Sequence, residues 1–383
     1  MTAQQQPAPA PRVKGWCPGA HRPMMSGDGL LFRVRPFFGE LSREQAFGLC
    51  DLAERFGNGM LDLTSRANLQ IRGVAEVNQT ALLEALDRLG VIDADPAVEK
   101  CRNILMPPDW SAGDATHALY CRVLETLPSL PDLPGKFGVT IDTASQPCLR
   151  EGSADFRFEH STSGALILRA DGAPRGRAVT DDTAMDALRD MAQWFIGSGG
   201  FSAGRMARHL ANCSLPTGWA DVSPRSQVTT PQVGAAPGGT ILGAPFGKIV
   251  CTDLRALLQN SQAMHLRPML GRKLMVCDAQ VTEAAGFVTT PSRLMDVHAC
   301  PGAPYCPAAS VKTAQLARAL APVTNGSLHV SGCEKGCAFP RAAATTFVGR
   351  GGTFDLVSEG QPWDEPCQRG LSPDTLMTMG ERG

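Results

Sequence analysis

Two short stretches hold the most informative pattern in the chain: HACPGAPYC at residues 298–306 and GCEKGC at residues 332–337. Cys300 and Cys306 have five residues between them, Cys333 and Cys337 have three, and both pairs lie in turns containing Gly. Four Cys thiolates held by such loops are typical ligands of a [4Fe–4S] cluster. Zinc sites more often have Cys pairs two to four residues apart. The five residues between Cys300 and Cys306 therefore favour a cluster over zinc. Unrelated buried thiols are the remaining alternative.

The overall composition excludes several classes of protein. The 383 residues include 36 Lys or Arg and 37 Asp or Glu, a net charge of −1, so we expect neither nucleic acid nor a membrane surface as a partner. No apolar run is long enough to span a bilayer, and residues 1–20 read as a mobile tail without the features of an export signal. We therefore expect a cytoplasmic protein. In that compartment the 13 cysteines favour metal or redox chemistry over a disulfide framework.

Local patterns predict alternating strands and helices, an α+β (mixed α/β) fold. Residues 29–35 read as a strand in which Arg33 and Arg35 share one face. Ser42 and Gln45 have the spacing of a capping box, and Gly57 is placed to end the helix that follows. Further helices are expected over residues 79–88 and 181–196, and a shorter one capped by Asp253.

The same order of elements returns after residue 235, which predicts two related halves. In our alignment of the halves, residues 63–66 correspond to 266–269, residues 101–103 to the Cys300 region, and residues 136–137 to the Cys333 region. The predicted units are a tail (1–20), a half-domain (21–75), an α/β domain (76–213), a linker (214–240), a second half-domain (241–280), a second α/β domain with the cysteines (281–350) and a C-terminal extension (351–383).

The cysteine pattern resembles the iron–sulfur signature of the nitrite and sulfite reductase family. The resemblance covers most of residues 20–350 and extends to four further segments: FRVR at 32–35, LTSR at 63–66 with Gln70, RN at 102–103, and LPGKF at 133–137. It implies two pseudo-symmetric halves, each with a ferredoxin-like half-domain and a larger α/β domain. It also implies a [4Fe–4S] cluster on the four cysteines beside a tetrapyrrole, with Cys337 between the two.

The same resemblance suggests a basic site next to the cluster. We expect a set of residues to bind substrate there: Arg33, Arg35, Arg66, Gln70, Arg102, Asn103 and Lys136. Arg66, Arg102 and Lys136 are the expected catalytic residues.

One segment departs from the reductase pattern. Members of the family that reduce sulfite or nitrite have several cations near the position of Lys136, whereas this chain has Gly135 and Gly138 there. Fewer cations disfavour reduction of a small oxyanion, and the smaller residues leave room for a larger substrate. This departure fits the precorrin-3B synthase branch of the family. That branch implies O2-dependent hydroxylation of precorrin-3A at C20 with lactone formation, with electrons entering through the cluster.

Two other functions stay open, a sirohaem-dependent nitrite or sulfite reductase and a non-catalytic carrier of a cluster or tetrapyrrole. Because the chain has no complete Gly-rich nucleotide motif, the electron donor is expected to be a separate reductase or ferredoxin. A mononuclear non-haem iron beside Cys337 is a further option for activating O2. Spacing alone does not select its ligands from the seven histidines: His21, His117, His160, His209, His265, His298 and His329.

Overall fold

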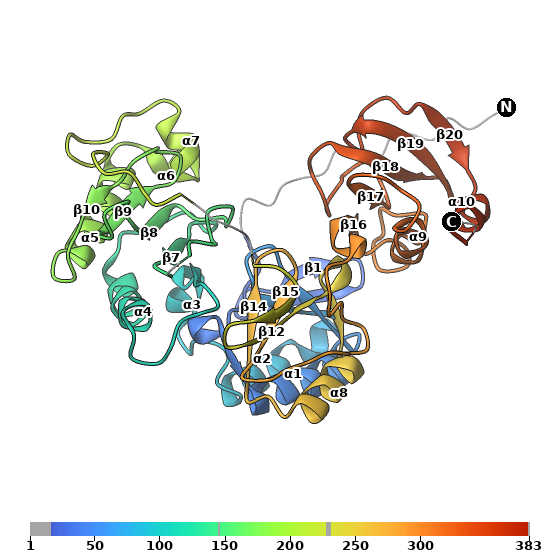
Figure 1. Cartoon of the computed structure of the whole chain (residues 1–383), viewed down its shortest axis with the longest axis horizontal. Helices are drawn as coiled ribbons and strands as arrows, with labels where there is room; N and C mark the ends of the chain where they lie inside the picture. The colour runs from blue at the N-terminus through green and yellow to red at the C-terminus, as the bar shows by residue number, and fades with distance from the viewer. Residues whose placement is uncertain (1–16, 145, 227–230, 382–383) are drawn as a thin grey trace.

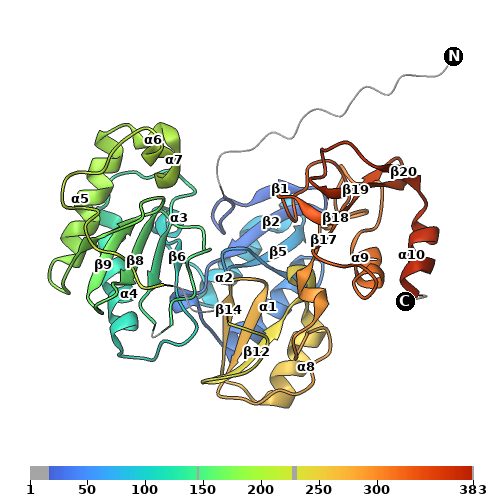
Figure 2. The same cartoon turned by 45° about the horizontal axis from the view of Figure 1, so that its top comes forward.

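The computed structural model describes residues 17–144, 146–226 and 231–381. Most of the predicted N-terminal tail and part of the predicted linker, residues 227–230, lie outside these ranges. The described chain forms two central sheets and two lateral units, which lie on opposite sides of the centre in both views (Figures 1 and 2). None of the described helices is long and apolar enough to cross a membrane.

The centre consists of two antiparallel five-stranded sheets. The strand order in sheet A is β1 (Met24–Ser26), β2 (Gly29–Val34), β5 (Leu69–Val74), β4 (Met60–Leu63) and β13 (Lys248–Val250). The strand order in sheet B is β11 (Gly234–Ala236), β12 (Gly239–Gly243), β15 (Lys273–Cys277), β14 (His265–Met269) and β3 (Leu41–Ser42). One edge strand of each sheet, β13 in sheet A and β3 in sheet B, comes from the other half of the chain. This exchange joins the two halves into one body.

The helices of the centre are α1 (Arg43–Phe56), α2 (Gln79–Arg88) and α8 (Cys251–Ser261). The predicted capping box is confirmed, since Gln45 N donates to Ser42 Oγ at 3.1 Å and Ser42 N donates back to the Gln45 side chain. The prediction for Asp253 is wrong. Val250 occupies the N-cap of α8, and Asp253 lies in the first turn, where a carboxylate favours the positive end of the helix dipole.

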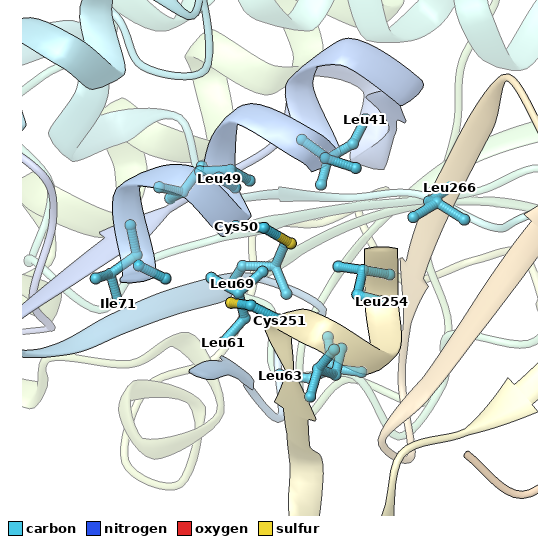
Figure 3. Packing of buried hydrophobic residues seen from close by; sticks show 14 of the residues in the cluster. Leu41, Leu49, Cys50, Leu61, Leu63, Leu69, Ile71, Cys251, Leu254 and Leu266 are labelled. Atoms are coloured by element: carbon cyan, nitrogen blue, oxygen red, sulfur yellow. The ribbon is translucent and has the colours of Figure 1, made fainter. Parts of the chain in front are cut away.

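A single apolar core joins both sheets to these helices (Figure 3). Leu49 of α1, Leu61 and Ile71 of sheet A, and Leu266 of sheet B all belong to it. The thiols of Cys50 and Cys251 meet within this core through a hydrogen bond that raises the pKa of Cys50. Because both halves contribute to the same core, the two half-domains are expected to fold as one unit.

The two halves have the same topology. Sheet A and sheet B have the same strand order, and each has a tight turn in which a phenylalanine adopts positive φ, Phe38 (57°) and Phe246 (60°). The register pairs Leu61 with Ile71 in sheet A and Leu266 with Val276 in sheet B. Leu61 therefore corresponds to Leu266. Our alignment of residues 63–66 with 266–269 was shifted by two residues.

The lateral units contain mixed sheets, C and D. The strand order in sheet C is β10 (Arg177–Ala178), β9 (Leu166–Ala170), β8 (Phe156–His160), β7 (Val139–Asp142) and β6 (Ile104–Leu105). The strand order in sheet D is β16 (Val297–Ala299), β17 (Leu328–Ser331), β18 (Ala343–Arg350), β19 (Thr353–Gly360) and β20 (Gln368–Leu371). The accompanying helices are α3 (Pro96–Cys101), α4 (Ala115–Thr126), α5 (Ala184–Gly197), α6 (Gly200–Ala203), α7 (Met206–Leu210), α9 (Ala314–Leu320) and α10 (Pro373–Glu381).

Several predicted boundaries differ from these units. Residues 351–383 are not a separate extension, because β19 pairs with β18 along its length and β20 continues sheet D. The first half-domain continues past residue 75, since Leu82 and Leu86 of α2 are buried in the central core. The predicted linker contains β11. The alignment of residues 101–103 and 136–137 with the cysteine regions is also wrong. These residues precede β6 and β7, whereas the cysteine pairs follow the equivalent strands β16 and β17.

Candidate functional site

The four cysteines of the two predicted pairs lie in the loops after β16 and β17. Cys300 follows β16 directly and is buried, and its Sγ accepts a hydrogen bond from Gly332 N at 3.1 Å. Cys337 is exposed at the surface, but partial desolvation of its thiol raises its pKa, and the thiols of Cys333, Cys300 and Cys306 raise it further. The structure therefore brings all four thiols into one electrostatic neighbourhood, although 26 residues separate the pairs in sequence.

The loops leave little room around Cys300. A Cβ at Gly332 would lie 2.6 Å from Ala309 Cβ and 3.3 Å from Cys300 Sγ. Gly302 has φ of 67°, and a Cβ there would lie 2.6 Å from Thr313 Oγ1, which donates to the Cys300 carbonyl at 2.5 Å. Glycine is thus required at both turns, because a side chain would displace the loop from the sulfur.

The chemistry of the four thiols is compatible with an iron–sulfur cluster. In the described part of the chain, no three His, Cys, Asp or Glu side chains are placed to hold one metal ion. A cubane is larger than an ion, and four Cys thiolates that receive backbone N–H hydrogen bonds are its usual ligands. In number, chemistry and grouping the four cysteines therefore fit a [4Fe–4S] cluster.

The outer face of sheet A, away from α1 and α2, is polar and lies next to the cysteine loops. Arg33 of β2 pairs in register with Gln70 of β5. With its oxygen turned toward Arg33, the Gln70 amide accepts hydrogen bonds from Nη2 at 2.8 Å and Nε at 3.1 Å. Arg72 lies two residues farther along the same face and interacts electrostatically with Cys306. We call Arg33, Gln70 and Arg72 the cationic face of sheet A.

The turn after β4 connects this face to the sheet C unit. Arg66 donates to the Lys136 carbonyl at 3.0 Å and to Ser153 Oγ at 2.9 Å. Burial lowers the pKa of the Arg66 guanidinium. Asn103 Nδ2 donates to the Phe137 carbonyl at 3.0 Å. The ammonium of Lys136 has no hydrogen-bond partner among the described residues, so it is available to an anion.

Comparison with known proteins identifies the fold. Residues 22–89 match the model of the nitrite/sulfite reductase ferredoxin-like half domain. The solved structure of the Mycobacterium tuberculosis NirA protein is similar with a TM-score of 0.63, at 19% identity, over 90% of this chain and 77% of that one. The chain has a nitrite/sulfite reductase-like fold. The predicted arrangement of two pseudo-symmetric halves is thereby confirmed.

Three relatives that are similar in amino-acid sequence add to this comparison. A precorrin-3B synthase from Sinorhizobium sp is 28% identical over 91% of this chain and 83% of its own length. A ferredoxin–nitrite reductase from Leptolyngbya laminosa is 26% identical but matches only 37% of this chain and 32% of its own length. An assimilatory ferredoxin-dependent nitrite reductase from Haloferax mediterranei is 28% identical over 31% of this chain and 22% of its own length.

Within this reductase-like fold, Arg35 and Arg102 do not join the cationic face. Arg35 is 7% exposed and forms an ion pair with Glu99. Arg102 is 2% exposed and pairs with Asp93 at 2.6 Å, and its guanidinium lies 3.7 Å from the Phe37 ring centroid. Both charges are already neutralised inside the protein. Their packing gives no support to the prediction that they bind substrate, which stays a prediction.

Three basic residues near the site were missed by sequence reasoning. Arg72 donates to Asp28 of the β1–β2 turn and lies within 3.7 Å of Asp62. Arg272 and Lys273 line a cavity of about 620 Å³ that reaches His298. The position of Arg72, two residues after Gln70 on a strand, was the available signal, since residues at this spacing share a face.

Two histidines lie on adjacent strands behind the cysteine loops. His298 and His329 are paired in register between β16 and β17. Burial lowers the pKa of His329 to about 4, so the ring is neutral at pH 7. His329 is fully buried, and neither ring nitrogen has a hydrogen-bond partner among the described residues. The ring of His298 stacks on Phe339 with centroids 4.1 Å apart.

Proposed function

We propose that the chain is a precorrin-3B synthase, which hydroxylates precorrin-3A at C20 with O2 and forms a lactone. The observation that carries the proposal is the extent of the similarity to the Sinorhizobium enzyme, which runs through 91% of this chain and 83% of that one. The similarity to the two nitrite reductases is confined to about a third of this chain.

The Lys136 segment supports a substrate larger than nitrite or sulfite. A Cβ at Gly138 would lie 2.5 Å from Asn103 Nδ2, so a long cationic side chain at that position would require Asn103 to move. Gly135 likewise supplies no charge. Fewer cations mean weaker polarisation of a small oxyanion, because charge-assisted hydrogen bonds are what position it. This favours the synthase over the alternative, a sirohaem-dependent nitrite or sulfite reductase.

The chain's own residues would bind the carboxylates of the tetrapyrrole. In this proposal Arg33, Arg66 and Lys136 would supply the cationic groups, and Gln70 and Asn103 would be their polar neighbours. Arg66 is held by Ser153 and by the Lys136 carbonyl, so little side-chain entropy is lost when it binds an anion. Of the predicted catalytic residues, Arg66 and Lys136 keep that role in the proposal and Arg102 does not.

Cys300, Cys306, Cys333 and Cys337 would hold a [4Fe–4S] cluster, which supplies single electrons when bound. The reaction balances when one oxygen atom of O2 enters the product and the other leaves as water, with two electrons and two protons from an external donor. That donor would be a separate reductase or ferredoxin. About five irons per chain in active protein would support an additional mononuclear iron, whereas full activity at about four would exclude it.

The proposal is tested by incubating anaerobically reconstituted protein with precorrin-3A, a reductant and O2. The expected product is heavier than the substrate by one oxygen atom. Bound sirohaem in the purified protein, together with nitrite- or sulfite-dependent oxidation of the reductant, would support the reductase instead. Tetrapyrrole binding without turnover would indicate a carrier.

A further inference from the structure

The pseudo-symmetry of the halves defines a second face equivalent to the cationic face of sheet A. In sheet A the pair Arg33–Gln70 lies next to Val34–Leu69. In sheet B the pair Ile241–Met275 lies next to Leu242–Leu274, at the same distance from the equivalent phenylalanine turn. Ile241 and Met275 thus occupy the positions of Arg33 and Gln70. On this second face apolar side chains stand at those two positions, and Arg267, the cross-strand neighbour of Met275, is paired with Glu40.

The cysteine loop that follows β17 also has a counterpart in the other half, the loop that follows β7. Strands β7 and β17 occupy the same place in sheets C and D, each between two parallel neighbours. Cys148 follows Asp142, the last residue of β7, at the same separation at which Cys337 follows Ser331, the last residue of β17. Asp142 holds this loop by accepting hydrogen bonds from Cys148 N and Leu149 N, both at 3.0 Å.

These two elements enclose a cavity of about 490 Å³ between the sheet C unit and sheet B. Its inner lining includes Cys148, Ile241, Met275 and Val233, all less than 9% exposed. Asp109 lies at the exposed rim. No other side chain of the described residues hydrogen-bonds to the Asp109 carboxylate, and no Lys or Arg lines the cavity. Both its volume and its lining are typical of sites for small molecules.

We propose that this cavity is a second binding site, for a small, mostly apolar molecule with a cationic or hydrogen-bond-donating group that meets Asp109. The apolar lining stabilises the body of such a molecule. The carboxylate at the rim favours a positive charge or a hydrogen-bond donor at its polar end. A polyanionic tetrapyrrole is disfavoured there, because Asp109 repels carboxylates and Arg267, a cation close to Asp109, is already paired with Glu40. The two equivalent sites therefore bind opposite kinds of ligand. This inference does not depend on the proposed synthase activity.

Three compounds that share an indole ring and differ in charge test the site on the full chain. Tryptamine has a cationic end, indole is neutral and indole-3-acetate is anionic. Binding is measured by ligand-observed NMR and isothermal titration. We expect tryptamine to bind about tenfold or more tightly than indole-3-acetate, a difference typical of one charge-assisted contact.

Two variants locate the binding. Asp109→Asn is expected to weaken tryptamine about tenfold and to leave indole unchanged, since only the charge at the rim is lost. Ile241→Trp fills the cavity and is expected to abolish binding of both compounds. Glu283→Gln, at an exposed acid outside the cavity, is the matched control. Tryptamine binding that survives both Asp109→Asn and Ile241→Trp, or no binding of any indole at about 1 mM, would overturn the proposal.

Discussion

The guanidinium of Arg72 lies between two carboxylates, 3.0 Å from that of Asp28 and 3.7 Å from that of Asp62. Burial lowers the pKa of Arg72, but the hydrogen bonds that it donates to Asp28 and the nearby negative groups outweigh this effect and raise it. A Cβ at Gly27 would lie 1.9 Å from Pro307 Cδ, so the β1–β2 turn also lies against the cysteine loop. Arg72 therefore links sheet A to the loop of Cys306.

We predict that Arg72→Met lowers the free energy of unfolding by roughly 3 kcal/mol, because it leaves the largely buried carboxylate of Asp28 without its ion-pair partner and removes one of the two cations beside Asp62. Arg72→Lys keeps the charge and should cost less. Denaturant unfolding of the three proteins measures the difference. A loss under about 0.5 kcal/mol in Arg72→Met, the size of an ordinary surface substitution, would show that this ion pair does not hold the loop.

Replacing any of Cys300, Cys306, Cys333 or Cys337 by Ser is expected to remove the brown chromophore, the bound iron and the activity. Cys50→Ser is the control, and it should cost about 1 kcal/mol of packing energy while iron content stays unchanged. Absorption spectra and iron and sulfide analysis of anaerobically reconstituted proteins measure these effects. Normal iron content in Cys337→Ser would remove that residue from the ligand set.

Arg66 and Arg102 should behave differently when truncated. Arg66→Ala is expected to weaken tetrapyrrole binding by about 1.5–3 kcal/mol, the value of a charged hydrogen bond, with little change in stability. Arg102→Met should instead destabilise the fold by roughly 3–5 kcal/mol, because Asp93 loses its buried partner. Arg122→Ala, at a more exposed pair with Asp181, is the control for binding. Unchanged affinity in Arg66→Ala would place Arg66 outside the site.

His329 makes stability depend on pH. Its pKa is lowered to about 4 in the folded protein, so below about pH 6.5 the unfolded chain binds a proton that the folded protein does not. Stability should therefore fall as the pH drops from about 6.5 to 4, by up to about 1.4 kcal/mol per pH unit from this residue.

His329→Phe should reduce this slope, and His265→Gln, at a half-exposed histidine, should not. Denaturant unfolding at several pH values gives both slopes. Equal slopes in wild type and His329→Phe would show that a group bound to the ring already compensates its burial.

The elements with strong local signals were predictable from sequence. The capping box at Ser42 and Gln45 defined the start of α1, and the apolar period placed α2 over residues 79–88 as observed. The exchange of β3 and β13 was not predictable, because the side-chain period of a strand says which face is buried but not which sheet it joins. Their lengths, two and three residues, also leave little pattern to recognise.

The candidate site likewise contains residues whose neighbours the strand pattern predicts and residues whose neighbours depend on the tertiary fold. Arg33 pairs in register with Gln70, and a shared face for polar residues is predictable where both lie inside regular strands. Arg35 was misplaced because β2 ends at Val34, so the alternation of faces no longer applies to the next residue. The burial of Arg102 depends on Asp93 and Phe37, contacts that only the tertiary fold brings about.

The most direct test of the proposed synthase activity is the source of the added oxygen. Anaerobically reconstituted protein is mixed with precorrin-3A and reductant, exposed to ¹⁸O₂, and the tetrapyrrole is analysed by mass spectrometry, with Cys337→Ser as the control. The synthase account predicts a product that contains one ¹⁸O atom, formed by the wild type and not by the variant. Unmodified precorrin-3A under these conditions, with nitrite or sulfite reduced by the same preparation, would contradict it.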